Sequence, residues 1–547
     1  MTQSKNTIST RLFTLILLLL SSIVSAQTEL GKIEIEYNET LPKEKGNIMA
    51  VAGIKNDSIY VLSRTKKEFF FQTFDAETKK ISASKPFEIE EDFEIRDYII
   101  LSDKLFLMLS LYDSDSNVYR FIAKEVRNNQ IIKSTELLTI NAERYSRKGE
   151  FLFKISNDNS KYLITHVNKN YRNSNVDYTM NLIDGNLNTL FSDKETISSE
   201  NKKVWSFKFS DTNFNDNGDI VFSLVESYRN KNEKNKYNYV TIFSYKSEKN
   251  YEKQLINIEL KDKYIADCNV VPTKGSKLHL TGFYSNLRKS GRAFWHYKGI
   301  YDIVIDFSNG EVLNVNFNPF PNFIYDLFIN KFAKEGKGLN YEVFKNVAFI
   351  ERDGGGIIVL TEYDWKSGAD TFGIWPLAWT SYYFDSRHVI ITALDSAGNL
   401  DWSNFIPKDQ SMSIDIFGIQ LIPSPNYTRP SSITFPLAEM GSGEEYLSVF
   451  PIYQNGIFTV LFNDDIRNDG TTPSDELWTA GNLKKMKTVA YTFDDNTGTK
   501  IRIEPKQFEK GQIILKPLID YRFSDDEYLI FGGNKEENAI GVLKVKK

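Results

Sequence analysis

The sequence predicts an all-β fold that is built from a repeated unit. Aromatic residues are abundant, with 39 Phe and 29 Tyr among 547 residues, whereas Pro is scarce at 15. Bulky aromatic side chains suit the pleated, half-buried surface of a strand. Eight times, a polar turn that contains Asp, Asn or Gly leads into an apolar run. These runs begin at Ile59, Leu105, Tyr162, Ile220, Leu278, Ile357, Ile457 and Tyr528.

The spacing of these runs indicates the architecture. The first five follow one another at intervals of roughly 46–58 positions, close to the length of one four-stranded propeller blade. The later intervals are longer, roughly 70–100 positions, and indicate blades with insertions. We therefore predict one β-propeller of seven or eight four-stranded blades over residues 27–547. Pairing of residues 32–37 with residues 539–545 would close the ring. Two smaller β-domains are the alternative, but no linker rich in Pro, Gly or Ser divides the chain.

A second kind of turn recurs further along the units. An apolar strand reaches Asp, and a turn that usually contains Gly leads into the next strand, as at Asp184, Asp306, Asp395 and Asp494. Asp starts such turns because its carboxylate accepts a hydrogen bond from the backbone two residues on, and Gly adopts the positive φ of a tight hairpin. Each unit therefore contains at least two hairpins. The continuous apolar strands predict sheets that are buried on both faces.

Three segments depart from the repeat and are predicted to be insertions. Residues 321–339 contain the only convincing helix of the sequence, near 322–334, with Ile324, Leu327, Phe328 and Phe332 at helical spacing. Residues 363–387 and 411–443 are the other two. Insertions of this length in a compact domain are usually functional or disordered, and their aromatic content argues against disorder.

The aromatic residues of the second insertion are the candidate binding residues. Three Trp, three Tyr and two Phe occur between positions 363 and 384. We predict a lid or platform that stacks sugar rings, peptide side chains or a partner protein. Packing of the same residues against the propeller is an equally good interpretation, and insertion of residues 372–379 into a membrane surface is a third. The predicted platform consists of Trp365, Trp375, Trp379, Tyr382 and Tyr383.

Residues 1–26 resemble a cleavable signal peptide. Lys5 and Arg11 precede an apolar stretch at 12–20, and small residues lead to Ala26. The stretch is too short to cross a bilayer as a permanent helix, and Gln27 stands where a lipoprotein has Cys. We expect an exported mature chain, periplasmic or secreted, without a transmembrane span or lipid anchor, and monomeric.

Charge and cysteine content narrow the function classes. Removal of Lys5 and Arg11 changes the net charge from −5 to −7, which excludes the basic surface of a nucleic-acid-binding protein. Cys268 is the single cysteine, so no internal disulfide can form. It precedes a predicted strand, and a buried, unreactive thiol is expected.

Motifs for metal or catalytic chemistry are weak. The histidines at 166, 279, 296 and 388 are widely spaced, and His279 lies in an apolar strand, where a hydrogen-bonded core histidine is expected. Residues 113–117 and 213–218 have alternating oxygen ligands for calcium but lack the Glu at the twelfth loop position; we expect hairpin turns there and no cofactor, with calcium as the alternative. No Gly-x-Ser-x-Gly elbow or phosphate-binding loop occurs.

Residues 395–402 and 406–410 carry a resemblance to exported bacterial β-propellers without a characterised activity. The resemblance implies a fold and a compartment but no chemistry. Two turns, Ala393–Trp402 and 494–498, also match the turn motif of quinone-cofactor propellers in part, and ordinary hairpin turns account for both.

These observations leave two function classes. We expect a non-enzymatic binding or scaffolding propeller of the cell envelope that recognises an envelope protein or a glycan through the aromatic insertions. The alternative is a glycan-acting enzyme with carboxylates in the central funnel. Convergent charged residues with perturbed pKa values would indicate the enzyme.

Overall fold

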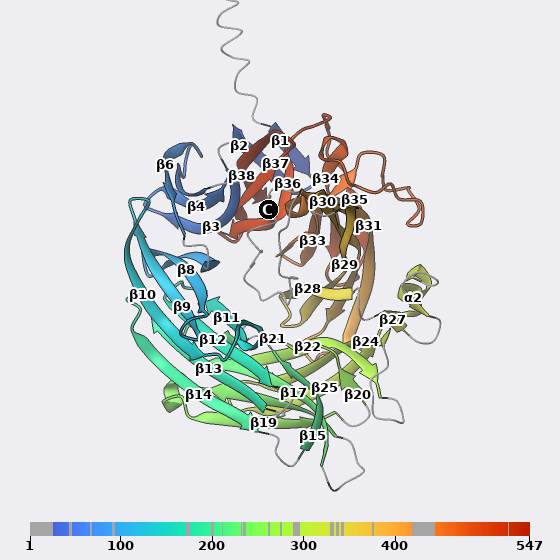
Figure 1. Ribbon diagram of the computed structural model, residues 1–547. Helices are drawn as coiled ribbons and strands as arrows, with labels where there is room; N and C mark the ends of the chain where they lie inside the picture. The colour runs from blue at the N-terminus through green and yellow to red at the C-terminus, as the bar shows by residue number, and fades with distance from the viewer. Residues whose placement is uncertain are drawn as a thin grey trace, which may run out of the picture.

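The computed structural model describes most of the chain, and its strands form a ring of twisted sheets (Figure 1). The described residues are 26–42, 46–65, 68–89, 93–170, 175–198, 202–210, 212–230, 232, 237–260, 263–273, 276–287, 296–328, 333–334, 338–340, 344–374, 377–417, 443–522 and 524–546. Among them, eight antiparallel sheets have four or five strands each. We number these sheets as blades 1 to 8.

The first four blades follow one another along the chain. Blade 1 is β3 (Asn47–Lys55), β4 (Ser58–Arg64), β5 (Phe69–Asp75) and β6 (Ile81–Phe87); blade 2 is β7 (Phe93–Leu101), β8 (Lys104–Asp113), β9 (Val118–Arg127) and β10 (Gln130–Asn141). Blade 3 is β11 (Glu150–Ile155), β12 (Lys161–Asn170), β13 (Asn175–Asp184) and β14 (Thr189–Ser198); blade 4 is β15 (Lys202–Phe209), β16 (Asn213–Phe214), β17 (Ile220–Asn230), β18 (Tyr237–Tyr245) and β19 (Lys253–Glu259).

The other four blades complete the ring. Blade 5 is β20 (Lys263–Ile265), β21 (Asn269–Pro272), β22 (Lys277–Asn286), β24 (Gly299–Asp306) and β25 (Glu311–Pro319); blade 6 is β28 (Phe344–Glu351), β29 (Ile357–Ile374), β30 (Leu377–Leu394) and β31 (Leu400–Phe417). Blade 7 is β32 (Phe450–Gln454), β33 (Ile457–Asp465), β34 (Met486–Asp494) and β35 (Lys500–Ile503); blade 8 is β36 (Ile514–Arg522), β37 (Glu527–Gly533) and β38 (Glu537–Val545), with β1 (Ala26–Leu30) and β2 (Ile33–Pro42).

The repeated turn of the sequence always comes before the same strand of a blade. In every blade the apolar run that follows it is the second strand: β4, β8, β12, β17, β22, β29, β33 and β37. These strands are buried on both faces, as the near-continuous burial of β8 and β33 shows. The fourth strands β10 and β14 alternate between half-buried and exposed residues and lie at the outer margin in Figure 1. The predicted propeller is therefore confirmed, with eight blades.

The apolar core lies between blades. Eight clusters of buried side chains each join one blade to the next, including blade 8 to blade 1. In the last of these, Leu41 of β2 and Phe531 of β37 pack with Ile59 of β4. Burial of this kind is the main favourable term in folding, so stability comes from stacking each blade on both neighbours.

The two ends of the described chain close the ring within blade 8. Strand β2 pairs with β38 from Ile33 opposite Val545 to Pro42 opposite Glu537. This is the pairing expected from the sequence. Strand β1 adds one more strand at the outer edge, beginning at Ala26.

Antiparallel order gives the ring two different faces. The turns between strands one and two and between strands three and four lie on one side, which we call the turn face. The turns between strands two and three and the links between blades lie on the other side, which we call the link face. Both turn types recognised in the sequence belong to the turn face. There, Asp184 Oδ1 accepts from Asn186 N at 2.8 Å and Asp395 Oδ1 from Ala397 N at 2.9 Å, as expected.

The three predicted insertions form helices and strands in the parts that the structure describes. Helix α2 (Asn322–Phe328) is shorter than expected, because 333–334 form β26 (Ala333–Lys334), which pairs with β27 (Gly338–Asn340) and thereby uses its backbone hydrogen bonds outside a helix. Strand β27 also pairs with β23 (His296–Tyr297). Most of 363–387 belongs to β29 and β30, which stay paired as far as Ile374 and Leu377. Short 3-10 helices at Tyr145–Arg147, Ser247–Lys249, Glu444–Tyr446 and Leu483–Lys485 complete the elements of the described chain.

Within the described residues, no helix has the length and apolar character needed to cross a bilayer; α2 has 7 residues.

Candidate functional site

A hollow of about 630 Å³ opens between α2 and the link-face ends of the blade 5 strands, with Leu400 of β31 completing its lining. Strands β20 and β22 contribute Lys263 and Tyr284, and Lys298 immediately precedes β24. Helix α2 contributes Tyr325 from the other side. In Figure 1 this helix lies at the outer margin of the ring, beside β24 and β27. The described lining residues are Lys263, Tyr284, Asn286, Lys298, Pro319, Phe320, Pro321, Asn322, Tyr325 and Leu400.

Backbone and core contacts fix the helix against the blade. The Lys298 carbonyl accepts hydrogen bonds from Tyr325 Oη at 2.7 Å and from Phe320 N at 3.0 Å. Lys298 N in turn donates to the carbonyl of Tyr284 at 2.9 Å. Ile324, fully buried, anchors the helix in the cluster between blades 5 and 6. The walls of the hollow are therefore held in place without a ligand.

The hollow combines positive charge with aromatic surface. Lys263 Nζ donates to Asn286 Oδ1 at 3.1 Å. Burial lowers the pKa of Lys298, so a bound anion would stabilise its charged form. Burial also raises the pKa of Tyr284 to about 12, which keeps this phenol protonated at neutral pH. None of the described lining residues is acidic. The arrangement suits a ligand that carries an anionic group on a ring or another apolar body.

The predicted aromatic platform is only partly within the described residues. The backbone of Trp365 pairs with Asp385, and that of Trp379 pairs with Phe372, so both lie on long strands of blade 6. The side chains of Trp365, Trp379 and Tyr382, and the whole of Trp375, lie outside the described residues, as do 418–442. Tyr383 on β30 is half-buried. The binding platform formed by these residues therefore stays a prediction.

A charged cluster lies on the link face where blade 2 meets blade 3. Arg96 of β7 donates to Ser110 Oγ and Tyr119 Oη, both at 2.7 Å, and pairs with Glu94. Lys148 Nζ is 3.2 Å from Glu94 Oε1 and 4.5 Å from the centroid of the Tyr119 ring. Burial opposes ionisation of Glu94, but Arg96 and Lys148 lower its pKa overall. A carboxylate that stays ionised in this way is a poor general acid at neutral pH.

A buried polar network joins the link segment 443–449 to blade 6. Lys408, fully buried, pairs with Glu362 and donates to Ser386 Oγ at 2.6 Å and Gln410 Oε1 at 2.9 Å. Ser448 Oγ donates to Glu362 Oε2 at 2.8 Å. A serine beside a lysine can be a nucleophile with its base, but Ser386 is buried within the network. We interpret this group as a structural contact.

Two residues predicted to be structural are confirmed as such. His279 is fully buried, with Nδ1 2.7 Å from Asp302 Oδ2 and Nε2 3.3 Å from the Gly355 carbonyl. Cys268 is buried, and burial raises the pKa of its thiol to about 11, so the thiol is protonated at neutral pH. In one of the two calcium alternatives, Asp113 Oδ1 accepts from Asp115 N at 3.0 Å within a hairpin turn.

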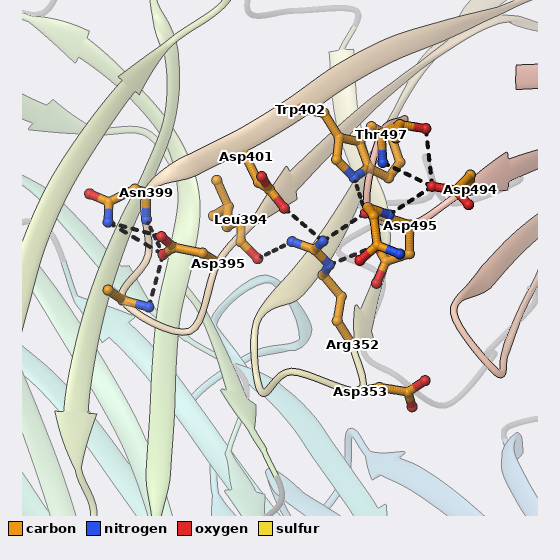
Figure 2. Close-up of polar contacts among 12 residues, drawn as sticks. Arg352, Asp353, Leu394, Asp395, Asn399, Asp401, Trp402, Asp494, Asp495 and Thr497 are labelled. Atoms are coloured by element: carbon orange, nitrogen blue, oxygen red, sulfur yellow. Dashed lines mark hydrogen bonds and ion pairs between the residues drawn. The ribbon is translucent and has the colours of Figure 1, made fainter. Parts of the chain in front are cut away.

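The two partial matches to the quinone-cofactor turn motif contact each other across blades 6 and 7 (Figure 2). Trp402 Nε1 donates to the Asp495 carbonyl at 2.6 Å. Gly498, at φ +65°, passes so close that a Cβ there would lie 2.8 Å from the indole, so glycine is required. The two turns thereby connect neighbouring blades.

Arg352 adds a second link between the same turns. Its guanidinium donates to Asp495 Oδ1 at 2.7 Å, to Asp401 Oδ2 at 2.8 Å, to the Leu394 carbonyl at 2.9 Å and to the Asp495 carbonyl at 2.9 Å. The side chain is 9% exposed. Figure 2 shows the guanidinium between the turn of blade 6 and that of blade 7.

Sequence reasoning missed the residues of the hollow. Lys263, Tyr284, Lys298 and Tyr325 come from four separate segments, and only the pairing of blade 5 and the docking of α2 bring them together. The one local signal is the Pro319-Phe-Pro321-Asn322 segment, since Pro directly before a helix marks where it starts.

The comparisons with known proteins do not assign the chain to a family. No family model matches the sequence, and no curated protein matches it. Solved structures that it resembles include the Kuenenia stuttgartiensis hydrazine synthase, at 11% identity over 60% of this chain and 78% of that one, with a TM-score of 0.29. They also include the β-propeller domain of the trilobed protease from Pyrococcus furiosus, at 11% identity over 63% and 94%, TM-score 0.29, and the Dos1 propeller, at 10% identity over 94% and 95%, TM-score 0.37. The order of strands in its own eight sheets identifies the chain as a β-propeller.

Proposed function

We propose that this β-propeller is an exported, non-enzymatic binding protein of the cell envelope, and that the hollow beside α2 binds a carboxylated sugar. The observation that carries the proposal is the lining of the hollow: two lysines and three aromatic rings, without an acidic residue among the described lining residues. Ammonium groups offer charge-assisted hydrogen bonds to a carboxylate. The aromatic walls offer apolar surface to the ring that carries it. A volume of about 630 Å³ lies within the usual range of ligand pockets.

The charge on the ligand is tested with a matched pair of sugars. We expect the mature protein to bind digalacturonate and not its dimethyl ester in isothermal titration calorimetry, because only the acid has carboxylates. Lys263→Met with Lys298→Met should weaken binding at least about 100-fold, since each charge-assisted hydrogen bond contributes roughly 1.5–3 kcal/mol. Lys80→Met with Lys249→Met, which removes two exposed lysines of the turn face, is the control. Equal binding of the acid and the ester would contradict the proposal.

Export is supported by the sequence of residues 1–26 alone. We expect the full chain, expressed in a Gram-negative host, to be recovered from the periplasm with Gln27 at its N-terminus. Mass spectrometry of the intact protein reads the cleavage point directly. An uncleaved chain in the cytoplasmic fraction would refute this part of the proposal.

A second candidate, a glycan-acting enzyme, is favoured by one observation. Burial raises the pKa of both Asp97 and Asp520 to about 6, although both residues are only half-buried. They lie on β7 and β36, the first strands of blades 2 and 8. A carboxyl with a pKa near 6 is suited to act as a general acid. Release of reducing ends from a polysaccharide panel, lost in Asp97→Asn or Asp520→Asn, would establish the enzyme in place of the binding protein.

A further inference from the structure

The loop 466–485 between β33 and β34 holds an exposed tryptophan on the link face. Trp478 is 53% exposed, whereas Trp402 in the turns of blades 6 and 7 is 8% exposed. The neighbouring residues Asp475, Glu476 and Thr479 are also exposed. A single large apolar side chain on a surface is ordinary, so the contacts that hold this loop decide what the exposure means.

Buried groups fix the backbone of Trp478. Asn468, fully buried, accepts from Trp478 N and donates to the Trp478 carbonyl, both at 2.8 Å. Its amide also donates to Asp464 Oδ1 at 2.7 Å. Two residues further on, Ala480 N donates to the Asp409 carbonyl of β31 at 2.8 Å. The loop is thus attached both to its own blade and to the long hairpin of blade 6.

A second buried carboxylate positions an arginine on the indole. Asp465, 3% exposed, accepts from Arg467 Nε at 2.7 Å and from Nη2 at 2.8 Å. The guanidinium carbon then lies 3.8 Å from the centroid of the Trp478 ring. Hydrogen bonding to Asp465 raises the pKa of Arg467, which keeps it charged. Arg467 therefore covers one face of the indole.

We propose that Trp478, held in place by Arg467, binds a pyranose ring of a neutral glycan. The ring would stack its C–H groups on the face of the indole opposite Arg467, because the π-system of the indole is negative. One indole among short polar residues is far smaller than the roughly 800 Å² per partner of a stable protein interface. This size favours a small ring over a protein partner. The site is on blade 7, and its chemistry is separate from that of the anionic ligand in blade 5.

The test is affinity electrophoresis of the mature protein in native gels that contain laminarin, xyloglucan, galactomannan or dextran. Retardation by at least one of these neutral polysaccharides is expected, with loss of the retardation in Trp478→Ala and partial retention in Trp478→Tyr. Ile501→Ala removes a side chain of 62% exposure elsewhere on blade 7 and is the matched control. Digalacturonate binding should be unchanged in Trp478→Ala, which separates this site from the hollow and also reports that the variant is folded.

Two results would overturn the inference. One is migration of the wild-type protein unaffected by all four polysaccharides. The other is retardation of Trp478→Ala equal to that of the wild type. A preference for a protein partner would appear as the first of these results. Failure of digalacturonate to bind would instead count against the hollow in blade 5 and leave the Trp478 site as it stands.

Discussion

The turn face and the link face of this propeller are built differently from the same strands. Turns of the turn face repeat one design, in which Asp accepts from the backbone two residues on, at Asp184, Asp306, Asp395 and Asp494. Connections of the link face are more varied, although Asp113 and Asp465 accept from the backbone in the same way. They include α2, the long hairpin of blade 6 and the loop 466–485. The turn face therefore holds neighbouring blades together, whereas the link face is free to vary, as loops on a rigid scaffold commonly are.

The largest effect is expected where turns of neighbouring blades meet. Arg352→Met should lower the free energy of unfolding by about 3–5 kcal/mol, because it leaves Asp495, 9% exposed, without its cation. The measurement is urea denaturation followed by tryptophan fluorescence. Arg522→Met, on the same face but with a side chain 51% exposed beside Asp525, should cost less than about 1 kcal/mol. Similar losses in the two variants would show that the contact between blades 6 and 7 has no special role.

The effect of pH should distinguish an inner-strand carboxyl from one in a turn. Burial raises the pKa of Asp97 to about 6, above its value near 3.9 in an unfolded chain. The folded state therefore binds the proton more tightly, and this group lowers stability as pH rises from 4 to 6. Asp97→Asn should raise the free energy of unfolding by roughly 3 kcal/mol at pH 7.5 and leave it nearly unchanged at pH 4. Urea denaturation at the two pH values measures the difference.

For Asp184, a carboxylate of the turn face, we expect the opposite dependence of stability on pH. Hydrogen bonds from Asn188 and Asn186 outweigh burial and lower the pKa of Asp184. Its contribution to stability is present above the unfolded pKa and is lost as pH falls through the folded one. Asp184→Asn should therefore destabilise the protein at pH 7.5 and have less effect at pH 3. A change in the free energy of unfolding of Asp97→Asn that is equal at pH 4 and pH 7.5 would refute the account of Asp97.

The smallest effect concerns backbone conformation alone. Asn455 is exposed and has φ 50° in the turn before β33. Asn455→Ala should cost about 1 kcal/mol, because left-handed backbone is unfavourable for a residue with a Cβ and no compensating side-chain hydrogen bond. Asp475→Ala, at an exposed position of the loop 466–485, should change the free energy of unfolding by less than about 0.5 kcal/mol. Thermal midpoints measured side by side would detect the difference, and equal midpoints would contradict it.

The same contrast explains what the sequence could predict. Turns of the turn face can be recognised from a few neighbouring residues. Asp57 before Ile59, or Asp494 before Gly498, is enough to predict a turn. From those turns the sequence predicts the blades, their buried second strands and the pairing of residues 32–37 with 539–545 that closes the ring. The helix was predicted too long because apolar spacing cannot show that 333–334 pair with β27.

Link-face chemistry has no such local signal. Lys263 and Tyr325 share the hollow although they lie far apart in the sequence, on different elements. Trp478 is exposed because buried Asn468 holds its backbone, a contact that residue type alone does not reveal. The dense aromatic residues at 363–384 suggested a separate insertion, whereas the described backbone there continues the strands β29 and β30.

Hydrogen–deuterium exchange with saturating digalacturonate tests most directly whether the link face is the binding face. We expect slower exchange in β20, in the ends of β22 and β24 beside Lys298, and in α2, with no change in the turns at 184–188 and 494–498. Slower exchange in those turns, with none around the hollow, would contradict the account.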